Sequence, residues 1–246
     1  MTDDNRDETE HDNKGSLLIA IDGTAGAGKT TIGQMLASGL GIAYLDTGAM
    51  YRAVTLQALE NKVSLDPVNV SALASLARNL AFVSRDATAD EATDGRQYTV
   101  LLGGQDVSQA LRSPEVEKWV SVIAAVPQVR TELVERQREI ARHSPGGIVM
   151  MGRDIGSVVL PDADLKVYLD ASPEVRATRR SRQETAKTAE EALRNLKSRD
   201  KIDSQRASAP LVIAPGALVI STDNLNQQQV FERILEALKL VLEKRK

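Results

Sequence analysis

Residues 16–30 read SLLIAIDGTAGAGKT, and this stretch decides the fold. Residues 16–22 are a short apolar run that ends at a glycine-rich turn, a pattern typical of a buried strand in a parallel sheet. Residues 23–30 match the pattern G-x-x-x-x-G-K-[ST]. Residues 29–40 then have apolar side chains at the spacing of a helix with one buried face. A strand, a glycine-rich loop and an amphipathic helix in this order predict a phosphate-binding loop.

The chemistry of phosphate binding explains each part of this loop. Glycines let the backbone curve until several N–H groups point at one anion, and the start of the helix adds its positive dipole end. Lys29 supplies a mobile positive charge for the β- and γ-phosphates of ATP, and the Thr30 hydroxyl is a ligand for Mg²⁺. The expected ATP-binding residues are Gly23, Thr24, Ala25, Gly26, Ala27, Gly28, Lys29, Thr30 and Thr31, with Thr30 as the metal ligand.

The rest of the chain largely alternates short apolar runs with helical patterns. Further strands are expected at residues 42–45, 147–151, 165–169 and 217–220. Helices are expected at residues 47–60, 126–142, 173–182 and 227–246. Thr47 is the expected N-cap of the helix that follows the second strand. The alternation predicts an α/β domain built on a five-stranded parallel sheet.

Residues 63–112 interrupt this alternation. A helical segment at residues 70–80 is followed by three extended segments, and the two glycines at 103–104 indicate a hairpin between the last two of them. The extended segments are residues 81–84, 97–102 and 106–107. We therefore expect an inserted lobe with a small antiparallel sheet, flanked by core segments at 16–62 and 113–246.

Composition excludes several classes of protein. The 246 residues are 42% hydrophobic and 26% charged, which is ordinary for a globular domain. Residues 1–15 are acidic and have no apolar residue beyond Met1, so we expect a disordered tail. The absence of cysteine excludes disulfides and thiolate zinc sites, and 3% aromatic residues argues against a nucleic-acid polymer as partner. Without a signal peptide or a membrane-length apolar run, we expect a cytoplasmic, monomeric enzyme that binds no membrane.

The segment after the third strand narrows the choice among phosphate-loop proteins. A regulatory GTPase needs a guanine-reading N-K-x-D segment, which the sequence lacks. Residues 147–151 lead instead into Gly152-Arg153-Asp154, which places an arginine and a carboxylate at the carboxyl end of a parallel strand. Doubly wound sheets bind their ligands at that edge. The pattern favours an enzyme that holds a second, anionic substrate beside ATP.

Three segments together carry a family resemblance. Residues 46–52 read DTGAMYR, residues 152–156 read GRDIG, and residues 199–206 read RDKIDSQR before the Ala-Pro-Leu at 209–211. In combination with the phosphate-binding loop they resemble the bacterial cytidylate kinases, a family of P-loop nucleoside monophosphate kinases. The resemblance runs from about residue 16 to residue 242 and includes a nucleotide-binding insert that corresponds to residues 63–112. It implies a P-loop kinase core with that inserted lobe and a short helical lid at about residues 178–200.

The resemblance implies transfer of the γ-phosphate of ATP to CMP or dCMP, with Mg²⁺ bound alongside ATP. By matched position, the expected CMP-binding residues are Asp46, Thr47, Tyr51, Arg52, Ser121, Arg130, Arg153, Asp154, Arg199, Asp203 and Arg206. The expected catalytic residues are Lys29, Arg153, Arg179, Arg182 and Arg206.

The implied roles agree with the chemistry of the side chains. Ser121, Arg130 and Asp154 would contact cytosine, whose exocyclic amine is a donor that a carboxylate accepts. The sugar would be held by Asp203, Arg199 and Tyr51. The acceptor phosphate would be bound by Arg52, Arg153 and Arg206, because a guanidinium binds phosphate through two parallel hydrogen bonds. Arg179 and Arg182 of the lid would close over the donor phosphates.

Two other readings of the motifs stay open at this point. In the first reading the chain is a kinase of another small acceptor, such as UMP, AMP or shikimate. The kinases of those acceptors carry other acceptor motifs, which argues against this reading. In the second reading the chain is a nucleotide-gated binding module without transfer activity, which the number of arginines in the signatures disfavours.

Overall fold

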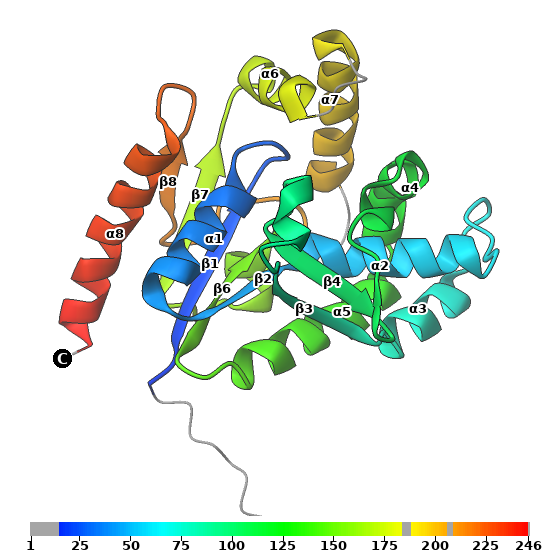
Figure 1. The fold of residues 1–246 in the computed structure, drawn as a ribbon, viewed down its shortest axis with the longest axis horizontal. Coiled ribbons are helices and arrows are strands. Elements are labelled where there is room, and N and C mark those ends of the chain that lie inside the picture. Colours follow the sequence, from blue (N-terminus) through cyan, green and yellow to red (C-terminus); the bar gives the residue numbers. More distant parts are fainter. Residues whose placement is uncertain (1–14, 184–187, 206–208, 246) are drawn as a thin grey trace, which may run out of the picture.

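The computed structural model describes residues 15–183, 188–205 and 209–245. The predicted acidic tail therefore lies outside the described residues, apart from Gly15. The core of the fold is the expected five-stranded parallel sheet (Figure 1). The strands, in their order across the sheet, are β2 (Ala43–Asp46), β6 (Gly147–Met151), β1 (Leu17–Gly23), β7 (Leu165–Asp170) and β8 (Leu218–Ser221).

Strand β1 lies at the centre of this sheet and is buried on both faces. It pairs in parallel with β6 and with β7, so that Ile19 is opposite Val149 on one side and Leu165 on the other. Ile19 and Ile21 belong to the apolar cluster on one face of the sheet, whereas Ala20 belongs to the cluster on the other. This alternation follows from the two-residue period of a strand and explains why the run is apolar throughout.

Helices α1 (Lys29–Leu40) and α8 (Gln227–Lys244) cover one face of the sheet (Figure 1). Leu36 of α1 and Ile234 of α8 are fully buried in the apolar cluster there. Helix α8 starts with a capping box in which Asn226 and Gln229 satisfy each other's backbone N–H groups. Packing against the sheet and α8 holds α1 in place, and with it the loop that leads out of β1.

Helices α2 (Thr47–Glu60), α4 (Pro114–Ala124) and α5 (Pro127–Arg142) pack against the second face. The predicted N-cap of α2 is wrong by one residue. Asp46 is the cap, because its Oδ1 accepts a hydrogen bond of 2.9 Å from the Gly48 N–H. The Thr47 side chain points elsewhere, and its hydroxyl donates to the Met151 carbonyl at 3.0 Å.

Residues 63–112 contain the predicted antiparallel sheet. It consists of β3 (Phe82–Asp86), β4 (Tyr98–Leu102) and β5 (Gln105–Asp106), and helix α3 (Val70–Arg78) precedes it. Gly103 and Gly104, both with positive φ, form the turn between β4 and β5. Leu73, Phe82 and Val100 belong to the same apolar cluster as the buried residues of α2 and α5, so this segment shares a core with the main sheet.

Helices α6 (Pro173–Gln183) and α7 (Ala189–Gln205) pack on each other at the carboxyl edge of the sheet (Figure 1). Ala177 of α6 and Leu196 of α7 form a small apolar cluster with Ala25 of the glycine-rich loop. The pair corresponds to the expected lid, of which residues 184–187 lie outside the described part. Within the described residues, no helix is long and apolar enough to cross a membrane.

Candidate active site

The glycine-rich loop joins β1 to α1 at the carboxyl edge of the sheet. Gly23, Gly26 and Gly28 all have positive φ, which side chains with a Cβ adopt only with strain. At Gly23 the neighbouring strand adds a steric reason, because a Cβ there would lie 2.0 Å from the Leu169 carbonyl oxygen. The backbone thus has the curvature that an anion-binding loop at a helix N-terminus requires.

Lys29 begins α1 and its side chain is buried under this loop. The ammonium group donates to the Gly23 carbonyl at 2.9 Å and to the Thr24 carbonyl at 2.8 Å. Burial, followed by the charge of Arg153, lowers the pKa of Lys29 below its usual value, while nearby carboxylates oppose that shift. The cation is therefore poorly compensated, which favours an anion at this position.

Thr30, the predicted ligand of Mg²⁺, lies in the first turn of α1. Its hydroxyl lies 3.8 Å from the Met151 sulfur, which is only a weak acceptor. Among the described residues no three His, Asp or Glu side chains are grouped to hold a metal ion. The donor set fits an ion that takes most of its ligands from phosphate and water, which is the usual way that proteins bind Mg²⁺.

Asp22 is a buried residue of this edge that the sequence analysis missed. Its carboxylate accepts hydrogen bonds of 2.7 Å from the Ile155 and Gly156 N–H groups, at the start of a π-helical turn spanning Ile155–Val159. Burial raises its pKa to about 6, although the two backbone hydrogen bonds oppose this shift. Asp22 fixes the segment that carries Arg153 and Asp154 against β1. The available signal in the sequence was its position as the second-last residue of a buried strand, next to the loop.

Arg153 connects the loop to helix α7. Its guanidinium donates to the Gly23 carbonyl at 3.0 Å and to Asp203 at 2.9 Å. Asp203 is itself buried, and its charge is among those that oppose the lowered pKa of Lys29. The structure thus brings together one residue from each of three predicted segments.

Arg130 and Asp154 form a second group, deeper in the fold. They make an ion pair in which both side chains are almost fully buried, with 4% and 7% of their surface exposed. The Arg130 guanidinium also lies over the Tyr51 ring, 5.6 Å from its centroid, and donates to the Ala124 carbonyl at 3.3 Å. Ser121 lies one turn before the end of α4 and is buried. A carboxylate held in this ion pair has a fixed orientation toward any ligand that reaches it.

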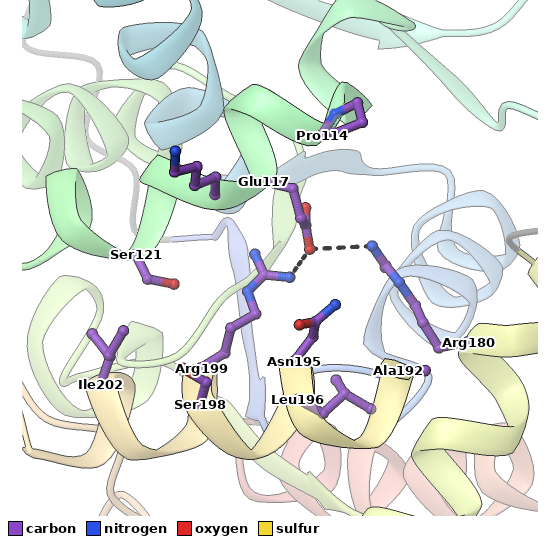
Figure 2. A pocket seen from close by; sticks show the side chains of 11 residues that line it. Pro114, Glu117, Ser121, Arg180, Ala192, Asn195, Leu196, Ser198, Arg199 and Ile202 are labelled. Atoms are coloured by element: carbon purple, nitrogen blue, oxygen red, sulfur yellow. Dashed lines mark hydrogen bonds and ion pairs between the residues drawn. The ribbon is translucent and has the colours of Figure 1, made fainter. Parts of the chain in front are cut away.

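Three arginines from different helices meet at Glu117 of α4. Figure 2 shows two of them, Arg180 and Arg199, beside its carboxylate. Arg52 of α2 donates to its Oε2 at 2.7 Å, while Arg180 of α6, at 3.2 Å, and Arg199 of α7 contact its Oε1. Neither Glu117 nor Arg180 was among the predicted site residues. The signal for Glu117 was its position four residues before Ser121, which places both on one side of the same helix.

The remaining predicted residues lie at the margins of these groups. Asp46 caps α2 and accepts a hydrogen bond of 2.8 Å from the Tyr98 hydroxyl of β4. Arg179 points to Thr222 after β8, donating to its hydroxyl at 2.9 Å and its carbonyl at 2.7 Å. Arg206 and the side chain of Arg182 lie outside the described residues.

Arg176 is a further arginine that the sequence analysis missed. It is buried, donates to the Ala25 carbonyl of the glycine-rich loop at 3.1 Å, and pairs with Asp200 of α7 at 2.7 Å. Because it bridges the loop and α7 through α6, it fixes both helices of the expected lid relative to the loop.

A parallel sheet with a phosphate-binding loop after its central strand, and arginines gathered at the same edge, defines a P-loop kinase. The family model described as cytidylate kinase matches residues 19–240, and the chain belongs to the cytidylate kinase family.

Curated relatives of two lengths agree with this. The chain is 44% identical over 228 residues to a cytidylate kinase of Caldanaerobacter subterraneus subsp. tengcongensis, covering 91% of this chain and 95% of that protein. It is 46% identical over 232 residues to a bifunctional pantoate ligase/cytidylate kinase of Synechococcus sp. (strain JA-3-3Ab). That match covers 92% of this chain but only 41% of the bifunctional protein's length.

The similarity to a solved structure concerns the fold only. An uncharacterised protein from Eubacterium ventriosum superposes with a TM-score of 0.50 at 11% sequence identity, over 91% of this chain and 99% of that one.

Proposed function

We propose that the protein transfers the γ-phosphate of ATP to CMP and dCMP, giving ADP and CDP or dCDP. The observation that carries this proposal is the buried pair of Arg130 and Asp154, within a chain that belongs to the cytidylate kinase family. A carboxylate with a fixed orientation is an acceptor suited to the exocyclic amine of cytosine.

On the donor side, the backbone N–H groups of residues 23–31 would hold the phosphates of ATP, with Lys29 at the β- and γ-phosphates. Lys29 already binds two carbonyl oxygens of the loop, so its ammonium group is positioned close to where a phosphate would lie. Mg²⁺ bound to the donor phosphates and to Thr30 would neutralise charge that develops during transfer. Arg179, beside Thr222, and Arg182 would act from the lid.

On the acceptor side, Arg52, Arg153 and Arg206 would bind the phosphate of CMP. Ser121, Arg130 and Asp154 would contact the base, and Tyr51, Arg199 and Asp203 the sugar, with Asp46 and Thr47 at the start of α2 completing the site. Arg153 contacts both the glycine-rich loop and Asp203, so it lies where the donor and acceptor phosphates would meet. This arrangement supports direct in-line transfer, because positioning and neutralisation of charge supply most of the catalysis of phosphoryl transfer.

The proposal includes the domain organisation of the chain. Residues 16–62 and 113–246 would form the kinase core with a lid at about 178–200, and residues 63–112 the lobe that closes on CMP. We further propose that the enzyme acts as a monomer in the cytoplasm, with ATP and CMP or dCMP as its small-molecule partners.

The test is a coupled assay of ADP release with ATP and Mg²⁺ against CMP, dCMP, UMP, AMP, GMP and shikimate. We expect CMP and dCMP to be turned over with a kcat/KM at least about a hundredfold above the others. Preference for another acceptor would leave the donor site intact and refute the assignment of the base-reading residues. No turnover of any acceptor, combined with tight binding of ATP, would instead favour a binding module.

A further inference from the structure

Glu117 lies at the centre of the arginines described above, although no motif of the sequence includes it. Its carboxylate is largely buried, with 19% of the side chain exposed, and three guanidinium groups contact it. They come from α2, α6 and α7, so a side chain of α4 connects α2 to both α6 and α7; Figure 2 shows the contacts with α6 and α7.

The charges at this point are unequal. One carboxylate faces three guanidinium groups, and burial alone would raise its pKa. The charges of Arg52, Arg199 and Arg180 outweigh burial and lower the pKa of Glu117 to about 2, so it is ionised throughout the neutral range. Burial lowers the pKa of Arg199 to about 10 even though Glu117 opposes this shift. Arg52 and Arg199 by themselves carry two positive charges against this one carboxylate, and a more highly charged anion would satisfy them better.

The geometry at Glu117 resembles the binding of an oxyanion. Arg52 contacts one carboxylate oxygen, and Arg180 and Arg199 contact the other. Carboxylate and phosphate bind guanidinium groups in the same manner, through charge-assisted hydrogen bonds from a planar fork. A phosphate dianion offers one more oxygen and about one more negative charge than the carboxylate.

A cavity beside Glu117 provides the space for such an exchange. It has a volume of about 380 Å³ between α4 and α7, and its lining includes Glu117, Ser121, Arg180 and Arg199 (Figure 2). Ser121 is assigned to the base and Arg199 to the sugar in the proposed function. A ligand that fills this cavity with its base toward Ser121 would bring its phosphate to the arginines that Glu117 contacts.

We propose that Glu117 is an internal competitor of the acceptor: its carboxylate holds Arg52, Arg180 and Arg199 together until the acceptor takes its place, with the phosphate at Arg52 and Arg180 and the sugar at Arg199. This inference rests on the proposed function, because it concerns the same acceptor site. Glu117 touches no reacting atom and acts through the arginines, so it is a positioning residue that sets the affinity for the acceptor. Arg180 becomes a ligand of the acceptor phosphate by the same argument.

The test uses the full chain with Glu117→Gln, which keeps the size of the side chain and removes its charge. We expect the KM for CMP to fall about tenfold, equivalent to about 1.4 kcal/mol of binding free energy. We expect kcat to stay nearly unchanged, because Glu117 touches no reacting atom. The inhibition constant of cytidine, which has no phosphate, should change less than twofold. Glu115→Gln is the matched control, since Glu115 is an exposed residue of the same helix. An unchanged or raised KM in Glu117→Gln would overturn the proposal.

Inorganic phosphate provides a second measurement that does not depend on turnover or on the identity of the acceptor. A ligand that binds only the folded state raises the Tm, and the rise is larger the higher its affinity. Inorganic phosphate should therefore raise the Tm of Glu117→Gln more than that of the wild type or of Glu115→Gln, even where Glu117→Gln is the less stable protein. An equal rise in all three would refute internal competition. Failure of the wild type to phosphorylate CMP, with a larger phosphate effect in Glu117→Gln, would refute the proposed acceptor and support the role of Glu117.

Discussion

Replacement of Asp154 by asparagine is the perturbation for which the structure gives the clearest magnitude. Asp154 pairs with Arg130, and the side chains are 7% and 4% exposed. Loss of one partner from a buried ion pair costs about 3–5 kcal/mol, because the other charge stays buried without compensation. An asparagine oxygen still accepts a hydrogen bond, and Arg130 keeps its contacts with Tyr51 and Ala124, so we expect the lower end of that range.

The assay is urea denaturation followed by circular dichroism, with thermal unfolding beside it. For a domain of this size, a loss of about 3 kcal/mol lowers the Tm by about 6–12 °C. The matched variant is the double substitution Arg130→Met with Asp154→Leu, which replaces the pair by apolar side chains of similar volume. It should unfold within about 1 kcal/mol of the wild type, because such replacements are often neutral. An Asp154→Asn protein as stable as the wild type would refute the argument from burial.

The same variant tests base selection at temperatures where it stays folded. An asparagine amide can donate to the O4 of uracil, whereas the carboxylate only accepts. We therefore expect the ratio of kcat/KM for CMP to that for UMP to fall at least about tenfold, as a lost base contact is worth about 1–3 kcal/mol. A ratio equal to that of the wild type would remove Asp154 from base reading while leaving its structural role intact.

Three further substitutions test the region around the glycine-rich loop. Lys29→Ala should lower kcat by at least about a hundredfold, as loss of one preorganised charge does in other enzymes, with circular dichroism reporting an intact fold; near-normal turnover would contradict the phosphate site. Gly23→Ala should give little folded protein on expression, because its Cβ would lie 2.0 Å from the Leu169 carbonyl oxygen, and a normal yield with normal Tm would show that the strands can separate there. Asp22 has a pKa of about 6 in the fold against an ordinary value of 3.8, so its contribution to stability is fully present below pH 3.8 and is lost as the pH rises through 6. Asp22→Asn should flatten this part of the pH dependence of the urea midpoint between pH 4 and pH 7, and an identical slope in both proteins would exclude Asp22 as its source.

Some features of the fold could be predicted from the sequence because they depend on neighbouring residues. Residues 17–23 form the predicted strand since an apolar run of this length that ends at glycines has few other favourable conformations. The loop at residues 23–28 follows from its glycines, whose positive φ values are a local property of the backbone. The N-cap of α2 shows that the local pattern locates the start of a helix only to within one residue. Asp46 and Thr47 are both suitable caps, and the local pattern does not separate them.

Tertiary packing took several charged residues into the interior, which the sequence did not indicate. Arg130, Asp154 and Asp22 are all buried. Sequence alone gives no indication that Arg130 lies over the Tyr51 ring, because the two residues come from different helices, α5 and α2. The family resemblance named Arg130 and Asp154 as ligands of the base, but it did not show that each compensates the charge of the other.

By itself, the sequence determined the phosphate-binding loop, the strands and helices that surround it, and the family to which the chain belongs. Each of these depends on local periodicity or on short motifs, which stay readable without knowledge of the fold. Only the tertiary structure decided that Glu117 holds arginines located 65, 63 and 82 residues away, and that Asp22 fixes a segment 133 residues further along the chain. Such contacts depend on the order of strands in the sheet and on helix packing, which long-range burial of apolar surface sets and no local pattern encodes.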